Sequence, residues 1–539
     1  MDSEDVPVLI AGGSLVGLST AVFLGMHGVE SLVVERHPGT AIHPRAALVN
    51  QRSIELYRSA GIEDMIIEAS GHEFVQNGAV MSVESLGGRE IDWYFRTINE
   101  GVEGLSPSSR LFITQIGLEP ILTPRAKELG ARLEYNTELI SFEADDEGIT
   151  AIVKRRDDGA ERSVRARYLV AADGSHSPIR RQLGIPIEGH GTFSNSITIY
   201  FRADVQPLLR DRNLSVIYVF GPRLVGFFRF SKDGDAGFLV VNTAITEDGV
   251  RTTDLWTDTS DERCIEFVRE ALGDPEIDVE IENVQRWNSC AEWAARLHEG
   301  RVFIVGDAAH NMPPTGGFGG NTGIQDGHNL AWKLALVLDG TAGPGLLESY
   351  DAERRAVAEF TVEQAYTRYV LRLDPNLGKE NLIPIVSEAT VELGYRYRSD
   401  AVLLEADGDD SPVEDPATPS ARPGTRAPHL VVIVNGAPIS LLDLMGHTFV
   451  LLAGSEGQAW CDAAEAVATQ LGVEIGPYRV GGVGSSLADD QGRFEELYGT
   501  GAAGASLIRP DGFVAWRAAD ADGDAEAVLR SALAQILAR

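Results

Sequence analysis

An acidic residue and a glycine-rich loop follow the apolar run 302–305. Asp307 comes almost directly after this run, and four of the five residues 316–320 are glycine. A carboxylate can accept a hydrogen bond from a ribose or ribityl hydroxyl, and glycines let backbone N–H groups approach a ligand closely. A helix is expected to begin near Asn321, so its positive end would face whatever the loop holds. The segment therefore predicts a site for a cofactor that gains negative charge.

The N-terminus has the pattern of a dinucleotide-binding βαβ unit. An apolar strand (8–10), a glycine-containing turn (12–17), a helix (18–27) and a second strand (31–34) follow one another. Glu35 ends the second strand, about twenty residues past the turn, where an adenosine ribose is expected to bind. The residues of this unit that we expect at the cofactor are Gly12, Ser14, Leu15, Val16, Gly17, Glu35 and Arg36.

Ser14 departs from the fingerprint, because a glycine is expected at this position. Backbone and pyrophosphate approach each other most closely there. The hydroxyl could be accommodated by a slight shift of the ligand, or it could donate a hydrogen bond to a phosphate. Both possibilities stay open, and with them the tightness of cofactor binding.

A third motif lies between these two. The apolar strand 168–172 is followed by Asp173 and Gly174, and the chain then enters a helix near Pro178. Chance alone does not account for three strand-and-turn motifs in this order.

Together the motifs resemble the class A FAD-dependent aromatic hydroxylases, which share the fold of para-hydroxybenzoate hydroxylase. The segment 306–334 is similar to the second FAD signature of that family, and Asp173 with Gly174 is similar to a motif tied to FAD and NAD(P)H. Arg45 and Gln115 correspond to positions that contact FAD in the family. The resemblance covers almost the entire chain.

Within the family, the chain looks most similar to the aromatic polyketide hydroxylases, the subgroup of aklavinone hydroxylase. The stretches that suggest this subgroup are 313–321, 394–399 and 422–424. The resemblance implies FAD as cofactor, NAD(P)H as hydride donor and O₂ as co-substrate. An electron-rich aromatic small molecule, phenolic or of polyketide type, would be hydroxylated through a C4a-hydroperoxyflavin. NADH and NADPH are not distinguished.

The resemblance also implies roles for individual residues. Pro313 and Pro314 would stiffen the loop that faces the flavin ring, and Tyr218 and Arg372 would lie near the substrate hydroxyl as catalytic candidates. A tyrosine in an apolar strand is more often a core residue, and an arginine near a helix end is usually solvated. The loop residues expected at the cofactor are Pro314, Gly317, Gly319, Gly320 and Asn321.

Three alternative functions remain. One is a catabolic phenol or hydroxypyridine hydroxylase. Another is an NAD(P)-dependent dehydrogenase that uses only the N-terminal unit, but this leaves Asp173 and Asp307 unexplained. The last is a flavoprotein that sequesters an intermediate without turnover, which a weakened site at Ser14 would favour.

Length and patterning predict a multidomain protein of α/β and α+β type, because 539 residues exceed a single core. We expect a Rossmann-like FAD domain with a ββαββ parallel sheet, a substrate domain built on an antiparallel sheet with an aromatic face, and a thioredoxin-like C-terminal domain without CxxC. That last domain should serve packing or dimerisation. The predicted ranges are 1–75, 106–190 and 285–400 for the FAD domain, 76–105 and 191–284 for the substrate domain, 401–424 for a polar linker and 425–539 for the C-terminal domain.

Charge and composition exclude several classes of partner. The net charge of -34 opposes binding to nucleic acid and to anionic lipid. The chain has no apolar stretch of about 18 residues and no signal peptide, so we expect a cytoplasmic protein. A monomer and a homo-oligomer are both left open. Cys264, Cys290 and Cys461 are too widely spaced for a zinc site or a disulfide framework.

Overall fold

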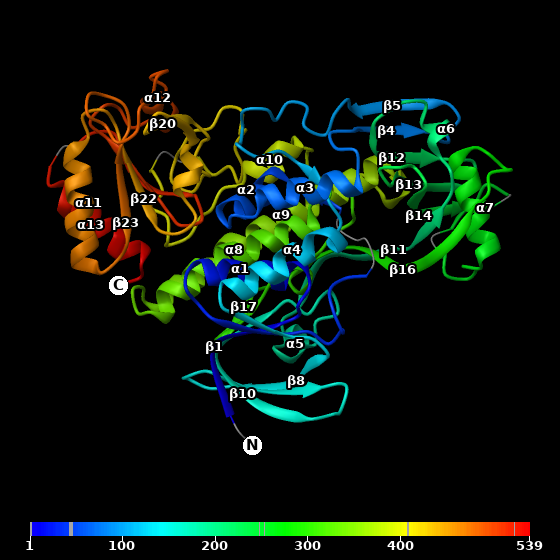
Figure 1. Cartoon of the computed structure of the whole chain (residues 1–539), viewed down its shortest axis with the longest axis horizontal. Coiled ribbons are helices and arrows are strands. Elements are labelled where there is room, and N and C mark those ends of the chain that lie inside the picture. Colours follow the sequence, from blue (N-terminus) through cyan, green and yellow to red (C-terminus); the bar gives the residue numbers. More distant parts are fainter. Residues whose placement is uncertain (1–2, 43–46, 247, 253, 407–408, 522) are drawn as a thin grey trace.

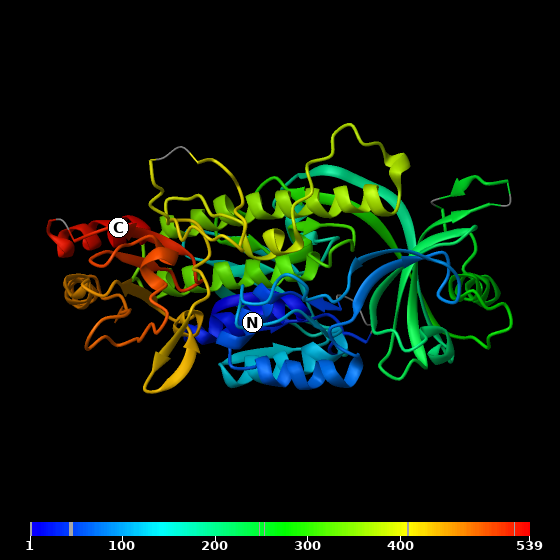
Figure 2. The same ribbon diagram turned by 90° about the horizontal axis from the view of Figure 1, so that it is seen from above.

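The computed structural model describes residues 3–42, 47–246, 248–252, 254–406, 409–521 and 523–539. Figures 1 and 2 show an elongated molecule made of three units in a row. The long helices α8 and α9 run through the central unit, a large sheet forms one end and the C-terminal unit forms the other. No helix within the described ranges is long and apolar enough to cross a membrane.

The central unit is built on an eight-stranded sheet whose main order is β17-β18-β10-β1-β2-β7, with β9 pairing β10 and β8 pairing β9. The neighbours β18, β10, β1, β2 and β7 are parallel, so their carboxyl ends meet at one edge of the sheet. The strands are β1 (Ser3–Ala11), β2 (Ser31–Val34), β7 (Ala131–Glu134), β8 (Thr137–Ala144), β9 (Ile149–Arg155), β10 (Glu161–Ala171), β17 (His298–Glu299) and β18 (Val302–Ile304).

Glycine is required where β1 turns into α1. A Cβ atom on Gly12 would lie 2.2 Å from the Ala172 carbonyl oxygen, and one on Gly17 would lie 1.9 Å from the Gly12 carbonyl oxygen. Helix and strands can therefore pack closely only without side chains at these positions. This confirms the close βαβ turn that the sequence predicts.

Helices and a short ribbon surround the central sheet. Helix α8 is buried along most of its length, and its first residue is Gly319, close to the predicted start at Asn321. These elements are α1 (Leu15–Met26), β3 (Leu48–Val49), α2 (Gln51–Ser59), α3 (Glu63–Glu73), β6 (Leu111–Phe112), α4 (Gln115–Glu128), α5 (Pro178–Gln182), α8 (Gly319–Leu338), α9 (Glu348–Arg372) and α10 (Glu388–Leu393), with 3₁₀ turns η1 (Gly306–Ala308), η2 (Pro344–Leu347) and η3 (Pro375–Leu377).

The second unit is a nine-stranded sheet with the order β19-β16-β11-β14-β13-β12-β4-β5, and β15 beside β14. It is antiparallel except for the β12–β4 pair, which is parallel. Strand β16 continues to Ala294, so the sheet extends past residue 284. The elements are β4 (Ala79–Val83), β5 (Glu90–Phe95), β11 (Ile187–Arg202), α6 (Gln206–Leu209), β12 (Leu214–Phe220), β13 (Leu224–Phe230), β14 (Ala236–Ile245), β15 (Arg251–Thr252), α7 (Asp261–Leu272), β16 (Glu280–Ala294) and β19 (His310–Asn311).

Alternation along these strands separates two faces. On β13, Phe228 and Phe230 belong to a core that also includes Phe267 of α7. Phe227 points to the opposite face, together with Tyr218 of the neighbouring strand β12. That opposite face is turned toward the central unit.

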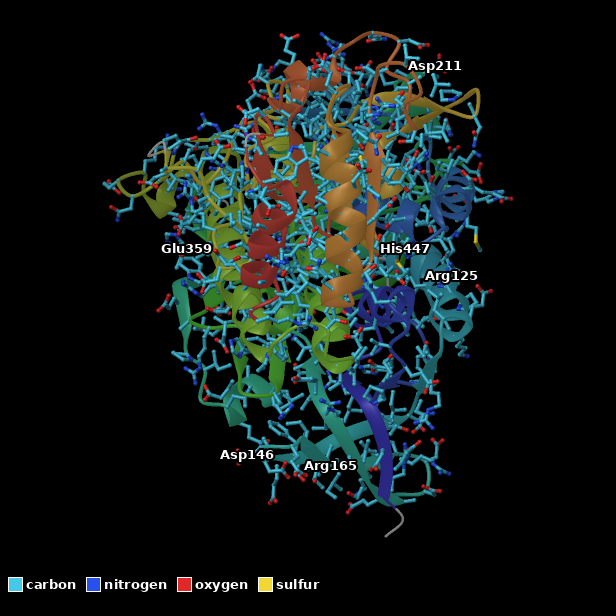
Figure 3. All side chains as sticks on the ribbon, turned by 90° about the vertical axis from the view of Figure 1, so that its left-hand side faces the viewer. Arg125, Asp146, Arg165, Asp211, Glu359 and His447 are labelled. Atoms are coloured by element: carbon cyan, nitrogen blue, oxygen red, sulfur yellow. The ribbon has the colours of Figure 1, made fainter. Side chains whose placement is uncertain are left out.

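The C-terminal unit has a four-stranded sheet with the order β23-β22-β24-β25, in which only β22 and β23 are parallel. Phe449 and Leu451 of β22 face α11 and α13, whereas Val450 and Leu452 face the small ribbon β20–β21. Figure 3 shows α11 and α13 side by side on the outer surface. The elements are β20 (Val431–Val434), β21 (Ala437–Ser440), η4 (Leu441–Leu444), β22 (Phe449–Ala453), α11 (Gln458–Leu471), β23 (Ile475–Arg479), α12 (Phe494–Tyr498), β24 (Ala505–Ile508), β25 (Val514–Ala518) and α13 (Ala525–Ile536).

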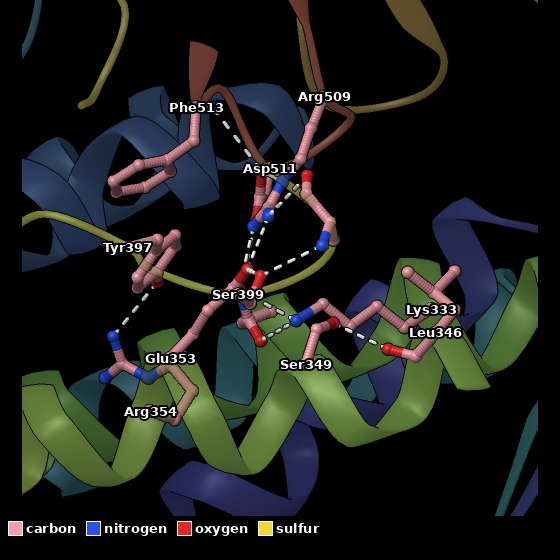
Figure 4. Close-up of polar contacts among 12 residues, drawn as sticks. Lys333, Leu346, Ser349, Glu353, Arg354, Tyr397, Ser399, Arg509, Asp511 and Phe513 are labelled. Carbon is pink, nitrogen blue, oxygen red and sulfur yellow. Dashed lines mark hydrogen bonds and ion pairs between the residues drawn. The ribbon is translucent and has the colours of Figure 1, made fainter. Parts of the chain in front are cut away.

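Buried charges join the C-terminal unit to α8 and α9 (Figure 4). Glu353 of α9 accepts from Lys333 Nζ at 2.8 Å and from Arg509 Nη1 at 2.5 Å. Arg509 also pairs with Asp511 at 2.5 Å, in the turn between β24 and β25. The segment predicted as a polar linker also contacts this unit, since Glu405 pairs with Arg517 at 2.5 Å.

Candidate active site

Glu35 closes the first glycine turn. Its Oε2 accepts from the Gly13 backbone N–H at 2.7 Å, and its Oε1 accepts from the His37 N–H at 2.8 Å. Each carboxylate oxygen keeps acceptor capacity for a ribose hydroxyl. Leu15 is buried and Val16 is half-buried beneath the turn, whereas Arg36 is exposed.

Ser14 is held by helix α4. Its hydroxyl donates to Glu119 Oε1 at 2.5 Å, and Gln115 Nε2 donates to Ser14 Oγ at 3.2 Å. Glu119 also accepts from the Ala41 N–H at 2.6 Å, and burial raises the pKa of its carboxyl group. Arg45 lies outside the described residues. Glu119 is a site residue that sequence reasoning missed.

Asp173 follows β10 at the same edge of the sheet. Its Oδ2 accepts from the Ile179 N–H at 3.3 Å. Its Oδ1 is buried, and among the described residues it has no hydrogen-bond partner. Burial raises the pKa of this carboxyl group. A second, external partner for Asp173 therefore fits the site, and Gly174 beside it has open space where a side chain would be.

Asp307 is exposed in the turn η1 at the end of β18. Asp326 of α8 fixes this turn from below, because its Oδ2 accepts from the Gly306 N–H at 3.0 Å and contacts His310 Nε2 at 2.7 Å. Its Oδ1 accepts from Arg354 Nε at 2.8 Å. The role of Asp326 in fixing this turn is not evident from the sequence.

These acidic residues follow β2, β10 and β18, at the carboxyl edge of the parallel sheet. Ligands of such sheets bind outside this edge. These features fit an extended dinucleotide such as FAD. They are the two glycine turns, Glu35 with acceptor capacity for a ribose, the buried Asp173 Oδ1 that has no hydrogen-bond partner among the described residues, and the exposed Asp307.

A cavity of about 410 Å³ lies between the glycine-rich loop and the large sheet. Loop residues Pro313, Pro314, Gly317, Gly319, Gly320 and Asn321 form one wall. Asn321 holds this wall in place, because its amide donates to the carbonyl oxygens of Gly317 and Leu48, both at 2.8 Å, and its Oδ1 accepts from the Asn50 N–H at 3.0 Å. Aromatic side chains of the sheet form the opposite wall, namely Tyr200, Tyr218, Phe227, Phe238 and Trp287.

The structure brings Tyr218 and Arg372 together in this cavity. Burial raises the pKa of Tyr218, although a hydrogen bond with Arg372 opposes the shift. Burial alone would lower the pKa of Arg372, but Tyr218 and Glu388 raise it above its ordinary value. Glu388 Oε1 lies 3.1 Å from Arg372 Nη2, so the guanidinium is charge-paired rather than solvated.

Two further arginines in the cavity wall were missed from the sequence. Arg110 forms an ion pair with Glu392 at 2.9 Å, and Arg229 lies on β13 with 3% of its surface exposed. A single charge within the apolar strand 225–230 was the available signal for Arg229. No local pattern marks Arg110, whose partner is 282 residues away.

Two family models cover most of the chain. The model for the FAD binding domain matches residues 5–365, and the model for the C-terminal region of aromatic-ring hydroxylases matches residues 420–539. The first match spans the glycine turns, Asp173 and Asp307. The second coincides with the C-terminal unit.

The chain is similar to characterised enzymes over its whole length. It is 49% identical to the 4-methyl-5-nitrocatechol 5-monooxygenase of a Burkholderia species, over 99% of this chain and 98% of that protein. It is 41% identical to the aklavinone 12-hydroxylase of Streptomyces purpurascens, over all of both chains. The crystal structure of aklavinone-11 hydroxylase with FAD and aklavinone matches with a TM-score of 0.93 at 40% identity, again over 100% of both chains. The chain thus belongs to the FAD-dependent aromatic-ring hydroxylases, monooxygenases that use FAD and NAD(P)H to hydroxylate an aromatic substrate.

Proposed function

We propose that the protein hydroxylates a phenolic ring held between the glycine-rich loop and the aromatic wall of the sheet. The observation that carries this proposal is that a single cavity contains the loop 313–321, Tyr218 and Arg372. Its volume of about 410 Å³ is at the small end of the usual range for ligand pockets, roughly 300–1,000 Å³. Substituted phenols and catechols are therefore the first candidates, as the name of the nitrocatechol relative also suggests.

A larger, polyketide-type substrate is the second candidate. It is favoured by the match to the aklavinone complex over the full chain. The cavity walls come from separate units, since the loop belongs to the central unit and the aromatic wall to the sheet. A small shift between these units would enlarge the space for a polycyclic ring system.

Several residues would hold FAD. Glu35 would accept from the adenosine ribose, the turn 12–17 would place the pyrophosphate at the start of α1, and Asp307 would accept from the ribityl chain. Gln115, which donates to Ser14 Oγ, would add a contact at the glycine turn, and Arg45 stays a predicted FAD contact outside the described residues. When bound, FAD supplies hydride acceptance from NAD(P)H and oxygen activation. The positive end of α8, which begins at Gly319, would stabilise negative charge on the flavin ring by about 1 kcal/mol.

Tyr218 and Arg372 would act on the substrate hydroxyl. The buried Tyr218 hydroxyl stays protonated near neutral pH, because burial raises its pKa. Arg372 would draw negative charge onto the substrate oxygen, which makes the phenolic ring more electron-rich. The apolar walls, including Phe227 and Phe238, would exclude water from this region.

The C-terminal unit would be a thioredoxin-like domain, in keeping with its βαβ and ββα order. Cys461 is the only cysteine among residues 425–539, so this unit has no cysteine pair for disulfide chemistry. Its buried ion pairs with α8 and α9 favour a bracing role. We also propose the domain ranges that the sequence predicts, a cytoplasmic location and a monomeric or homo-oligomeric state.

The proposal is tested by oxygen-dependent product formation with the FAD-loaded protein. A panel of 4-methyl-5-nitrocatechol, simple phenols, 3-hydroxypyridine and aklavinone would be assayed with NADH and with NADPH. We expect at least one phenol to accelerate coenzyme oxidation and to yield a product that has gained one oxygen atom or, where the attacked carbon carries a nitro group, a product in which oxygen has replaced that group and nitrite is released. Tight binding of an aromatic compound with no acceleration and no product would instead indicate a sequestering flavoprotein.

A further inference from the structure

A second pocket lies at the junction between the central unit and the C-terminal unit, and we call it the junction pocket. Helices α2 and α8 form one side of it, and the segment 442–447 with the turn 510–512 forms the other. Its volume is about 360 Å³, within the usual range for ligand pockets of roughly 300–1,000 Å³. No described residue lines both this pocket and the substrate cavity, so the two are separate sites.

Two buried side chains bring unpaired polar atoms to the junction pocket. Arg52 of α2 and His328 of α8 line it, and each has 5% of its surface exposed. Among the residues that the structure describes, Arg52 Nε and His328 Nε2 have no hydrogen-bond partner. Leaving buried polar atoms unpaired is costly, so a ligand that hydrogen-bonds to them would be stabilised in this pocket.

The charges inside the junction pocket are already matched by partners within the protein. The pairs are Arg52 with Glu55 at 3.0 Å, Arg58 with Glu63 and with Asp443 at 2.6 Å each, and Asp511 with Arg509 at 2.5 Å. Burial holds the pKa of His328 well below its usual value, and the positive charge of Arg52 adds to this shift, so the imidazole is uncharged at neutral pH. An ionic ligand would therefore meet no unpaired charge inside the pocket, and an uncharged ligand is favoured.

The unpaired nitrogen atoms and the apolar lining together define the ligand. Arg52 Nε only donates a hydrogen bond, whereas Nε2 of an uncharged His328 either donates or accepts, depending on the tautomer. A hydroxyl group both donates and accepts, so it can serve either tautomer. The thioether of Met445 suits contact with an aromatic ring. The apolar side chains that line the pocket are Leu56, Pro107, Leu442, Met445 and Pro510.

We propose that the junction pocket is a second binding site, which takes a small uncharged phenol with its hydroxyl end at Arg52 and His328 and its ring against Leu56 and Met445. A phenol bound there bridges α2 and α8 to the C-terminal unit and stabilises the contact between them. The inference goes beyond the proposed function, because the pocket is separate from the substrate cavity and binding there requires no turnover.

The test counts phenol molecules bound to the FAD-loaded protein by equilibrium dialysis, while the flavin spectrum reports the substrate cavity. We expect the wild-type protein to bind a phenol molecule that leaves the flavin spectrum unchanged. Toluene, which lacks the hydroxyl, and benzoate, which is charged, should bind at this spectrally silent site more weakly by about 10-fold or more. In His328→Phe and in Leu442→Trp, whose indole fills the pocket, the Kd of phenol at the silent site should rise by about 10-fold or more. Any binding that perturbs the flavin should keep its wild-type Kd in both variants.

Leu444→Trp is the matched control for Leu442→Trp, because both leucines are partly buried in the turn η4 but Leu444 does not line the pocket. It should leave silent binding unchanged. The proposal is overturned if no silent phenol molecule binds, if toluene or benzoate binds there as tightly as phenol, or if neither pocket variant weakens the binding.

A photolabel locates the site in the wild-type protein, which decides the question even if both pocket variants fail to fold. With 4-azidophenol we expect labelled peptides from residues 52–64 or 442–447, protected by excess phenol but not by toluene. Label that appears only in other peptides would overturn the proposal. Failure of the proposed function would look different, since no phenol would then stimulate coenzyme oxidation while the silent site still bound phenol.

Discussion

Ser14 Oγ donates a hydrogen bond of 2.5 Å to Glu119 Oε1. The serine that replaces a fingerprint glycine is thus tied to helix α4 rather than left free over the turn. Glu119 is fully buried and also accepts from the Ala41 N–H at 2.6 Å. One carboxyl group therefore joins the glycine turn, the segment after β2 and α4.

The first prediction concerns the pH dependence of FAD affinity. Burial raises the pKa of Glu119, and a pyrophosphate bound at the turn would raise it further by charge repulsion. The protonated carboxyl binds the anion better, so FAD affinity should fall as pH rises through the raised pKa that Glu119 has in the free protein. Equilibrium titration of the apoprotein with FAD between pH 5 and 8 measures this. Glu119→Gln should flatten the dependence, and a pH dependence that survives in this variant would refute the assignment.

The second prediction concerns Asp307. Asp307→Ala removes an acceptor for the ribityl chain, and hydrogen bonds to charged groups are worth about 1.5–3 kcal/mol, or roughly 10- to 150-fold in affinity. Thermal stability of the apoprotein should barely change, because the residue is exposed. Asp339→Ala, an exposed acid at the far end of α8, is the control. Wild-type FAD affinity in Asp307→Ala would sink the assignment.

The third prediction separates Tyr218 from its neighbour. Tyr94 contacts the Tyr218 ring edge-on, with ring centres 5.7 Å apart. Tyr218→Phe keeps the packing but removes the hydroxyl, so kcat should fall by about 10²-fold while FAD affinity stays unchanged. Tyr94→Phe should have little effect on kcat. Because burial raises the pKa of Tyr218, its ionisation should add no alkaline limb to the rate profile below about pH 10. Equal rates in the two variants would remove Tyr218 from the mechanism.

The fourth prediction concerns the buried charges in Figure 4. Burial alone would raise the pKa of Glu353, but Arg509 and Lys333 lower it well below its usual value. Its stabilising contribution is therefore complete above the unfolded-state pKa of about 4.3 and is lost as pH falls below it. Glu353→Gln should lower the free energy of unfolding by about 3–5 kcal/mol and weaken this acid dependence. Urea unfolding at pH 4 and pH 7 tests both, with Glu359→Gln, exposed on the same helix, as the control. An unfolding free energy like that of the control would contradict the prediction.

The sequence by itself was enough to predict the acidic residues at the carboxyl edge of the parallel sheet, where the cofactor is expected. Glu35, Asp173 and Asp307 could be predicted because each follows an apolar strand, and parallel strands end at one edge of a sheet. The need for glycine at Gly12 and Gly17 is likewise a local property of the strand-to-helix turn. Strand alternation also placed the aromatic wall on one face of the large sheet. Local patterns are enough for these features, because the backbone of each short segment carries them.

Only the tertiary structure decided which polar groups meet. Glu119 lies 105 residues from Ser14, Arg509 lies 156 residues from Glu353, and no periodicity in the sequence relates the two members of either pair. Arg229 was visible as one charge in an apolar strand, but its enclosure by Phe74 and Phe112 became apparent only in the packed chain. The physical reason is that burial and charge pairing are set by segments that pack together from distant parts of the chain. These non-local contacts determine pKa values and unsatisfied charges, and so they determine where a substrate can bind.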